Sequence, residues 1–228
     1  MSSKLTKEEK NWVLYDVGNS AFTLLITTIV PIYFNYLAGN AGLSDVEYLV
    51  YWGYAASLAT LIVAFMGPVC GSLADTKGYK KPIFVISLIV GAAGCISLGF
   101  AKNWLVFLVI FLIAKVGYSG SLIFYDSMLP DVTGEERMDR VSSLGYAFGY
   151  IGSCIPFVLS LVIVLGAGAI GITMEVAMGI AFLITAGWWV LMTIPLLKTY
   201  RQKHYVEKRK GAVKESFVRI GKTFLNVK

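Results

Sequence analysis

Six long apolar stretches, each with few or no charged side chains, constrain this chain more than any other feature of its sequence. A helix rises about 1.5 Å per residue, so about 20 mostly apolar residues are needed to cross the hydrocarbon core of a bilayer. Backbone groups in lipid must be hydrogen-bonded within the protein, and the alternating pattern of barrel strands is absent. We therefore predict an all-α membrane protein with six transmembrane helices over residues 12–37, 49–73, 82–101, 104–127, 141–166 and 175–197.

The composition excludes most soluble classes of protein. Hydrophobic residues make up 57% of the chain and charged residues 15%, whereas soluble domains carry about 25% charged residues. The single histidine, His204, and the three cysteines, Cys70, Cys95 and Cys154, lack the spacing of metal ligands or catalytic groups. We expect no enzymatic activity, no metal and no cofactor.

Lysine and arginine residues are unequally divided between the two predicted sides of the membrane. One side carries the N-terminus, two of the loops and everything after residue 197, with Lys4, Lys7, Lys10, Lys77, Lys80, Lys81, Arg137, Arg140 and the basic residues from Lys198 onward. The opposite side carries only Lys102. The positive-inside rule then predicts that both termini are cytoplasmic. The net charge of +6 reports this topology, so we expect no nucleic-acid partner.

The residues after the last predicted helix differ in character from the bundle. We divide the chain into a six-helix bundle, 1–197, and a basic tail, 198–228. Apolar residues recur in the tail with helical spacing, at Val206, Val213, Phe217, Ile220 and Phe224. Two interpretations stay open: a helix on the anionic lipid of the cytoplasmic leaflet, or a solvated linker helix between two domains.

The loop between the second and third predicted helices reads GSLADTKGYKK over residues 71–81. Glycine permits close helix approach and left-handed turns, and paired lysines are expected to contact lipid headgroups. The ordered string resembles the signature loop of the major facilitator superfamily, which lies between the same two helices. Thr76 departs from that pattern, where a basic residue is usual. The resemblance implies a conformational latch formed by Gly71, Asp75, Lys77, Gly78, Lys80 and Lys81.

Three further strings narrow the resemblance. Residues 12–22 read WVLYDVGNSAF, residues 124–130 read FYDSMLP, and residues 140–152 read RVSSLGYAFGYIG. Together they are similar to the vacuole effluxer-like branch of the superfamily, whose fungal namesakes are implicated in releasing amino acids from the vacuole. The chain departs from that branch at Lys115, where a neutral polar residue is expected, and at Asp126, where relatives tend to carry asparagine.

The resemblance implies half of a secondary transporter in the cytoplasmic membrane of a bacterium. Such transporters have two six-helix halves with the solute path between them, and this chain resembles the amino-terminal half. The implied function is alternating-access transport of a small polar solute, with an amino acid as a candidate and protons as a candidate coupling ion. The second half would come from a longer chain or from a second copy of this one. The alternative is a non-transporting membrane scaffold or regulatory subunit that pairs with another membrane protein.

Ionisable residues inside predicted helices are costly in a bilayer and therefore mark candidate sites. Lys115 lies near the middle of its helix and is expected to bind a solute carboxylate or relay protons, or else to be paired structurally. Gly117 and Gly120 are expected to leave room for a ligand beside it, with Tyr118 as a hydrogen-bonding partner.

Two aspartates are expected near the cytoplasmic side of the membrane. Asp16 and Asn19 share a helix face and form either the mouth of the path or a helix cap. Asp126 ends its helix and is expected to bind solute or protons, or to pair with Arg137 or Arg140.

Other residues are expected to shape the helices. Gly145, Gly149 and Gly152 form a small-residue stripe for helix packing, and Thr133 with Glu136 resembles a capping box. Aromatic residues near predicted helix ends are expected at the membrane interface: Trp12, Trp104, Tyr48 and Tyr51.

Overall fold

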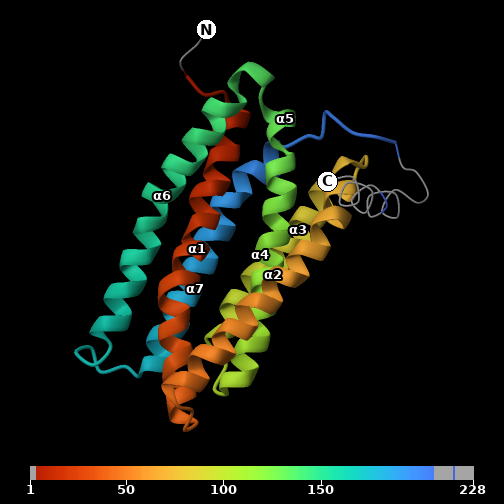
Figure 1. Cartoon of the computed structure of the whole chain (residues 1–228). Coiled ribbons are helices and arrows are strands. Elements are labelled where there is room, and N and C mark those ends of the chain that lie inside the picture. The colour runs from red at the N-terminus through yellow and green to blue at the C-terminus, as the bar shows by residue number, and fades with distance from the viewer. Residues whose placement is uncertain (1–3, 208–217, 219–228) are drawn as a thin grey trace.

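The chain forms a bundle of long helices in a computed structural model that describes residues 4–207 and 218 (Figure 1). Six of its helices are long and apolar enough to span a membrane, which confirms the predicted all-α fold. The elements are α1 (Lys7–Asn40), α2 (Asp45–Asp75), α3 (Lys80–Leu98), α4 (Trp104–Ser127), α5 (Leu129–Val132), α6 (Glu135–Gly166) and α7 (Met174–Thr199).

Helix α4 has the predicted bounds, and α1, α2 and α6 differ from the prediction most at their starts. Helix α1 begins five residues early because Thr6 and Glu9 form a capping box. A second capping box, between Ser44 and Glu47, starts α2. These polar ends lie outside the apolar stretches, so hydropathy alone does not reveal them.

The start of α6 differs from the sequence prediction. Its N-cap is Gly134, without a side-chain cap, so the expected capping box of Thr133 and Glu136 is wrong. The hydroxyl of Thr133 instead donates to Oε1 of Glu9 at 2.7 Å. Arg137 also binds Glu9, with distances of 2.9 Å from Nε to Oε1 and 2.7 Å from Nη2 to Oε2. Glu9 is buried, so this cluster ties the start of α6 to the start of α1.

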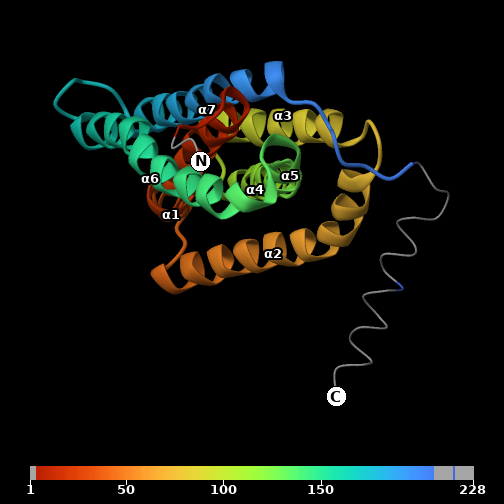
Figure 2. The same cartoon turned by 90° about the horizontal axis from the view of Figure 1, so that it is seen from above.

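The helices are arranged so that α1 lies inside the bundle and α2 along its edge. Helix α1 packs against α6 and α7, while α3 packs against α4 and α7. Seen from above, α7 and α3 form one side of the bundle and α2 lies on the opposite side (Figure 2). The start of α1 and the end of α7 meet at one end, where Asn11 Nδ2 donates to Oγ1 of Thr199 at 3.0 Å.

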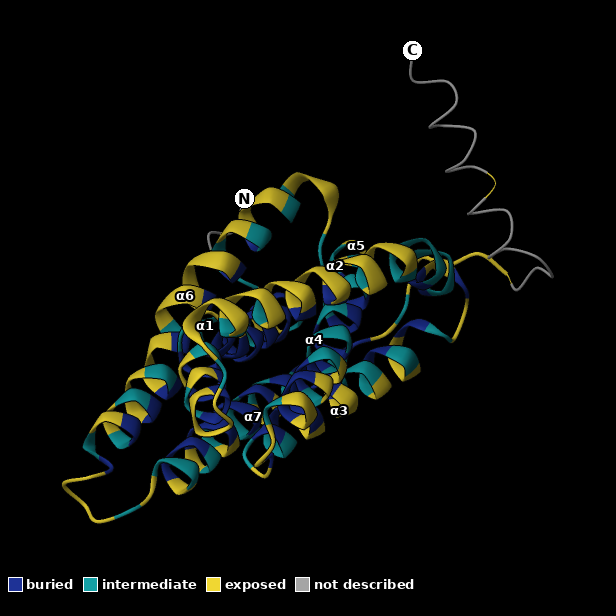
Figure 3. Cartoon of the chain, turned by 60° about the horizontal axis from the view of Figure 1, so that its bottom comes forward, coloured by how far each residue is buried: buried dark blue, intermediate teal, exposed yellow. Residues whose placement is uncertain are grey.

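Helices α2 and α6 are the least covered by the rest of the chain. Only 11% of the apolar window of α2 and 28% of that of α6 are buried, against 56% for α1. Exposed residues follow both helices along their length (Figure 3), including Phe65 on α2 and Ile151 on α6. Lipid or another protein surface must cover such apolar faces.

The space beside two glycines of α4 is filled by neighbouring helices. This corrects the expectation that Gly117 and Gly120 leave room for a ligand beside Lys115. A Cβ atom on Gly117 would lie 2.5 Å from the backbone N of Gly91 on α3. One on Gly120 would lie 3.0 Å from Oγ of Ser87. These glycines therefore let α3 and α4 approach closely and leave no room for a ligand.

Candidate functional site: a polar cavity between α1, α4 and α6

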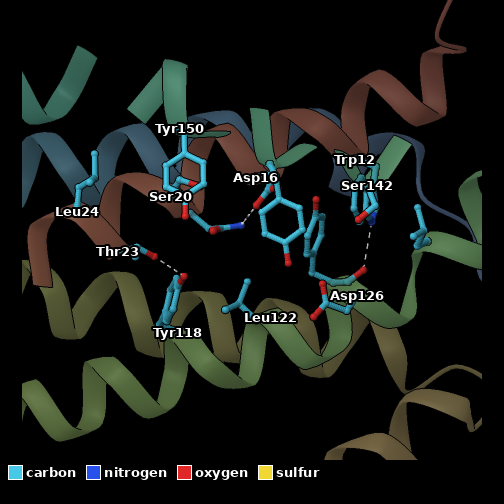
Figure 4. Close-up of a pocket in the computed structure, with 14 residues that line it drawn as sticks. Trp12, Asp16, Ser20, Thr23, Leu24, Tyr118, Leu122, Asp126, Ser142 and Tyr150 are labelled. Atoms are coloured by element: carbon cyan, nitrogen blue, oxygen red, sulfur yellow. Dashed lines mark hydrogen bonds between the residues drawn. The ribbon is translucent and has the colours of Figure 1, made fainter. Parts of the chain in front are cut away.

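A polar cavity of about 440 Å³ lies between α1, α4 and α6. It is notable for its polarity within an otherwise apolar bundle, since hydroxyl, amide and carboxyl groups line much of it (Figure 4). The lining residues are Trp12, Asp16, Asn19, Ser20, Thr23 and Leu24 from α1, Tyr118, Leu122, Tyr125 and Asp126 from α4, Leu129 from α5, and Ser142, Tyr146 and Tyr150 from α6.

Asp16 lies on the wall of this cavity beside α6. Its Oδ1 accepts a hydrogen bond of 3.1 Å from Nδ2 of Asn19, one helical turn further along α1. Its Oδ2 faces Gly145, where an added Cβ would lie only 2.9 Å away. The absence of a side chain at position 145 therefore leaves room for this buried carboxylate.

The glycine stripe of α6 fits against α1. An added Cβ on Gly149 would lie 2.8 Å from Oγ of Ser20, and one on Gly152 would lie 2.5 Å from Cγ1 of Val17. The close approach of the two helices brings the tyrosines of α6 to the edge of the cavity.

An aromatic stack supports the end of the cavity. The ring of Trp12 stacks on that of Tyr125 with centroids 4.3 Å apart, and Tyr15 packs against Tyr125 at 4.3 Å. Trp12 Nε1 also donates to the backbone oxygen of Tyr125 at 3.2 Å. Trp12 is thus buried in the bundle, and its predicted place in an interface belt is wrong.

The hydroxyl of Tyr125 is a buried polar group without a hydrogen-bond partner among the described residues. Buried hydroxyls normally find partners, so each exception calls for an explanation. This hydroxyl lies 3.6 Å from the position that a Cβ on Gly145 would take, next to the same glycine as Asp16 Oδ2. A hydrogen-bond donor or acceptor from outside the described residues would satisfy the Tyr125 hydroxyl.

Lys115 occupies a separate hollow. Its neighbours there include Thr27, Trp52 and Phe111, and the hollow has a volume of about 320 Å³. Its Nζ lies 5.1 Å from the ring centroid of Tyr118, whose hydroxyl is hydrogen-bonded to Thr23 at 2.6 Å rather than to the lysine. The structure therefore brings together Asp16, Asn19, Tyr118 and Asp126 and places Lys115 outside their cavity.

Asp126 opens onto the cavity without an ion pair among the described residues. Arg137, one of its two expected partners, instead binds Glu9 at 2.7 Å. None of the residues that line the cavity in the described part of the chain is basic. The cavity therefore contains two carboxyl groups and no cation supplied by its own lining.

The loop between α2 and α3 is held by the segment that follows α7. Gly78 has a φ of 77°, a left-handed conformation that favours glycine. The backbone of Thr76 pairs with that of Val206 in a parallel bridge, and Val206 N donates to the oxygen of Asp75 at 2.8 Å. Gln202 Oε1 accepts from Gly78 N at 3.0 Å. We call residues 200–207 the strap.

The extended strap corrects one part of the predicted tail helix. Val206 lies in the bridge and not on a helix. The other residues of that predicted stripe, Val213, Phe217, Ile220 and Phe224, lie outside the described residues. The side chain of Lys77 reaches Glu207 in the strap at 2.8 Å, in an exposed pair that contributes little to stability.

Lys80 is buried, so its expected contact with lipid headgroups is wrong. Its Nζ donates to the backbone oxygen of Ser127 at 2.8 Å and to Asp131 Oδ2 at 3.0 Å. The side chains of Lys80 and Asp131 are only 4% and 0% exposed. Lys81 is exposed at the same end of α3.

Asp131 connects this lysine to the strap. Its Oδ2 accepts from the hydroxyl of Tyr200 at 2.5 Å, and its Oδ1 accepts from the backbone N–H groups of Lys203 and His204 at 2.9 and 2.8 Å. One carboxylate thereby joins α3, α5 and the strap. Asp131 is not among the site residues that the sequence predicts. The only local signal is an acidic residue directly after Pro130, next to the end of a predicted helix.

These contacts decide the charge state of Asp131. Burial raises its pKa, but hydrogen bonds from Tyr200, the backbone of His204 and Lys80 outweigh burial and leave the pKa below its usual value. Burial and the neighbouring carboxylate raise the pKa of Tyr200, so its hydroxyl remains a donor.

The lowered pKa of Asp131 predicts a pH dependence of stability. Because the folded-state pKa is below the unfolded value of about 3.9, the stabilisation is fully present above that pH and is lost as pH falls through the folded-state pKa. We expect the difference in unfolding free energy between the wild type and Asp131→Asn to be constant from pH 7 to about 4 and to shrink below it. Unfolding titrations in mixed micelles would measure it, and a difference that vanishes by about pH 6 would contradict the assignment.

Residues 42–228 match the family described as "Vacuole effluxer Atg22 like". The chain belongs to this family, which is of the major facilitator type. It is 39% identical over 233 residues to "Uncharacterized MFS-type transporter YxiO" of Bacillus subtilis (strain 168), with all of this chain and 54% of that protein covered. It is 25% identical over 165 residues to an "Uncharacterized protein" of Aquifex aeolicus (strain VF5), with 69% of this chain and 40% of that protein covered.

Membership of the Atg22-like family confirms the resemblance drawn from the loop motif and the three strings. The chain spans about half the length of the curated relatives that it matches. Its six spanning helices make it a multi-pass integral membrane protein with the architecture of one half of a major facilitator fold.

Proposed function

We propose that this chain is half of a secondary transporter that carries a small polar solute through the cavity between α1, α4 and α6. An amino acid is the candidate solute, and the cytoplasmic membrane of a bacterium is the proposed location. The observation that carries the proposal is the cavity itself, which is lined by the buried Asp16 and Asn19 and by the exposed Asp126. Polar groups are costly at such positions and are typical of a solute path. The Atg22-like family supports the same class of function.

A second six-helix half is proposed to close the cavity. The chain covers 54% of its Bacillus relative, and the exposed apolar faces of α2 and α6 need a cover. Thr23 lines the cavity and is exposed in this half alone, so the cavity is open along this side. The second half is either the rest of a longer chain or a second copy of this one.

The loop between α2 and α3 is proposed to act as a conformational latch at the end of the bundle where α1 begins and α7 ends, which we place on the cytoplasmic side. The strap holds the backbone of this loop, while the carboxylate of Asp75 has no hydrogen bond or ion pair among the described residues. Asp75 therefore remains available to contact the second half. Gly71 has nothing within 4 Å of an added Cβ, so an approaching helix has room there.

Cysteine accessibility in the full-length protein that contains this chain tests the proposal without knowledge of the solute. Thr23 lies near the middle of α1 and lines the cavity, so Thr23→Cys is expected to react with a membrane-impermeant thiol reagent added to either face of the membrane. The background would carry Cys154→Ser, because Cys154 is the exposed cysteine among the described residues. Right-side-out and inside-out vesicles give the two measurements.

The matched control is Thr193→Cys, which places a thiol at a fully buried position on α7 outside the cavity. It is expected to react from neither face. Reaction of Thr23→Cys from one face only, or from neither, would contradict alternating access and would favour a static scaffold.

A further inference from the structure

We propose that the cavity binds its solute through an ammonium group, at a subsite formed by Asp16 Oδ2 and the Tyr125 hydroxyl beside Gly145, with Asp126 in the same cavity. This inference rests on the transport function proposed above and names the chemical class of solute. It selects amines and amino acids over carboxylic acids and uncharged polyols.

The charge of the cavity favours a cationic solute. Asp16 and Asp126 both line it, and no lysine, arginine or histidine does so in the described part of the chain. Arg137 binds Glu9 at 2.7 Å. Asp16 is buried, whereas Asp126 is exposed on the open side of the cavity. A buried carboxylate such as that of Asp16 is stabilised by a nearby cation. Since the lining supplies none, a cationic solute is the natural partner.

Two oxygen atoms beside Gly145 have no hydrogen-bond partner among the described residues. Asp16 Oδ1 already accepts from Asn19, while no hydrogen bond is formed by Oδ2 among the described residues. Tyr125 as a residue is 2% exposed, and its hydroxyl has no hydrogen-bond partner among the described residues. These two oxygens lie 2.9 and 3.6 Å from the position of a Cβ on Gly145 and therefore converge on one point of the wall.

An ammonium group matches these two atoms. It offers three N–H donors and no acceptor, so it can donate to the carboxylate oxygen and to the hydroxyl oxygen together. A carboxylate ligand would place like charges together at Asp16, and an uncharged hydroxyl would leave both aspartates without a counter-charge. The unpartnered hydroxyl of Tyr125 therefore favours a donor-rich cation.

Aromatic rings form part of the cavity wall. Trp12 and Tyr125 are stacked at 4.3 Å on one side of the cavity, and Tyr118, Tyr146 and Tyr150 also line it. Aromatic rings attract cations through their π faces. This chain already places one ammonium in such a setting, because Lys115 Nζ lies 5.1 Å from the centroid of Tyr118.

Lys115 is too distant to hold the carboxylate of the same α-amino acid. Lys115 and Tyr125, which forms part of the ammonium subsite, are separated by nearly three turns of α4, about 15 Å along the helix at 1.5 Å per residue. The ammonium and carboxylate groups of an α-amino acid are attached to one carbon. On this side of the path the ammonium is therefore the recognised group, and decarboxylated analogues should bind as well.

Matched compounds that differ in one charged group test the inference. The protein is the full-length molecule in detergent, and the probes are phenylalanine, phenethylamine and 3-phenylpropionate, with leucine, 3-methylbutylamine and 4-methylpentanoate as an aliphatic set. Isothermal titration calorimetry is expected to show saturable binding of the compounds that carry an ammonium group. It is expected to show no binding of 3-phenylpropionate or 4-methylpentanoate. Asp16→Asn is expected to weaken amine binding about tenfold or more, since a charge-assisted hydrogen bond is lost. Tyr125→Phe, which keeps the ring stacked on Trp12, is expected to weaken it about fivefold.

Thr193→Val is the control, because it removes a buried hydroxyl of α7 that does not line the cavity. Its amine affinity is expected to equal that of the wild type. The inference is overturned if the carboxylic acids bind as tightly as the amines, if no amine binds, or if Asp16→Asn leaves the affinity unchanged. If amines fail to bind while Thr23→Cys still reacts from both faces, only the ammonium assignment fails. If Thr23→Cys reacts from one face alone, the proposed function fails as well.

Discussion

Replacing Asp131 by alanine is expected to lower the free energy of unfolding by about 3–5 kcal/mol, because it leaves the ammonium of Lys80 buried without its counter-charge. The pair is separated by 3.0 Å and both side chains are almost fully buried. The same substitution removes the acceptor of Tyr200 and of two backbone N–H groups in the strap. Unfolding titrations in mixed micelles, followed by tryptophan fluorescence, would measure the loss.

The matched control for this prediction is Asp139→Ala. Asp139 is an exposed residue of α6 near the same end of the bundle, and its removal is expected to change the unfolding free energy by no more than about 0.5 kcal/mol. Equal effects of the two substitutions would show that Asp131 does not join α3, α5 and the strap. Tyr200→Phe should give an intermediate loss of about 1.5–3 kcal/mol, because it removes one hydrogen bond to a charged group.

Replacing Gly117 by leucine is expected to prevent α3 and α4 from packing and to cost about 3 kcal/mol or more. An added Cβ would lie 2.5 and 2.9 Å from the backbone N and Cα of Gly91, and 3.0 Å from the oxygen of Ser87. These are backbone atoms of a helix, so they cannot move aside as a flexible side chain can. Gly117→Ala should cost about 1–3 kcal/mol by the same contact.

Gly187→Ala provides the matched comparison for this glycine. It also lies inside a spanning helix, α7, but has nothing within 4 Å of an added Cβ. Alanine there is expected to be neutral or to stabilise the helix by up to about 1 kcal/mol, because it reduces the freedom of the unfolded chain. The yield of monodisperse protein and its melting temperature would report both variants. Similar values for Gly117→Ala and Gly187→Ala would contradict the close packing of α3 and α4.

Both predictions concern contacts that fix α4, the helix that carries Tyr118, Tyr125 and Asp126 into the cavity. Gly117 sets its distance from α3, and Asp131 lies in α5, the short helix that follows α4. A shift of α4 would separate the hydroxyl of Tyr125 from Asp16 on α1. Stability of this helix pair and geometry of the candidate site are therefore linked.

The spanning helices could be predicted from the sequence because hydropathy is a local property. The apolar stretch of α4 was enough to predict both of its ends. Helix α1 begins earlier than its apolar stretch because Thr6 and Glu9 cap it. The grouping of Asp16 with Asn19 was also predictable, since their spacing places both on one helix face. The loop motif indicated the superfamily because its order of glycine, aspartate and lysine is specific.

Contacts between helices could not be predicted from the same information. Whether Lys115 faces the cavity depends on the rotation of α4 relative to α1, and helical spacing inside α4 does not fix that rotation. Asp131 is 51 residues from Lys80 in sequence, so its role appears only when the two helix ends meet. The sequence of α4 predicts room for a ligand beside Gly117. That space is taken by Gly91, which lies on another helix, so α4 alone does not reveal the contact.

The rate at which Thr23→Cys reacts with an impermeant thiol reagent, measured from each face of the membrane, tests whether this cavity is a transport path. We expect measurable modification from both faces, and slower modification when phenethylamine occupies the neighbouring subsite of Asp16 and Tyr125. The cysteine on α7, Thr193→Cys, should remain unmodified in the same vesicles. Modification of Thr23→Cys from a single face, unaffected by phenethylamine, would contradict the claim that this cavity is the path of a transported ammonium-bearing solute.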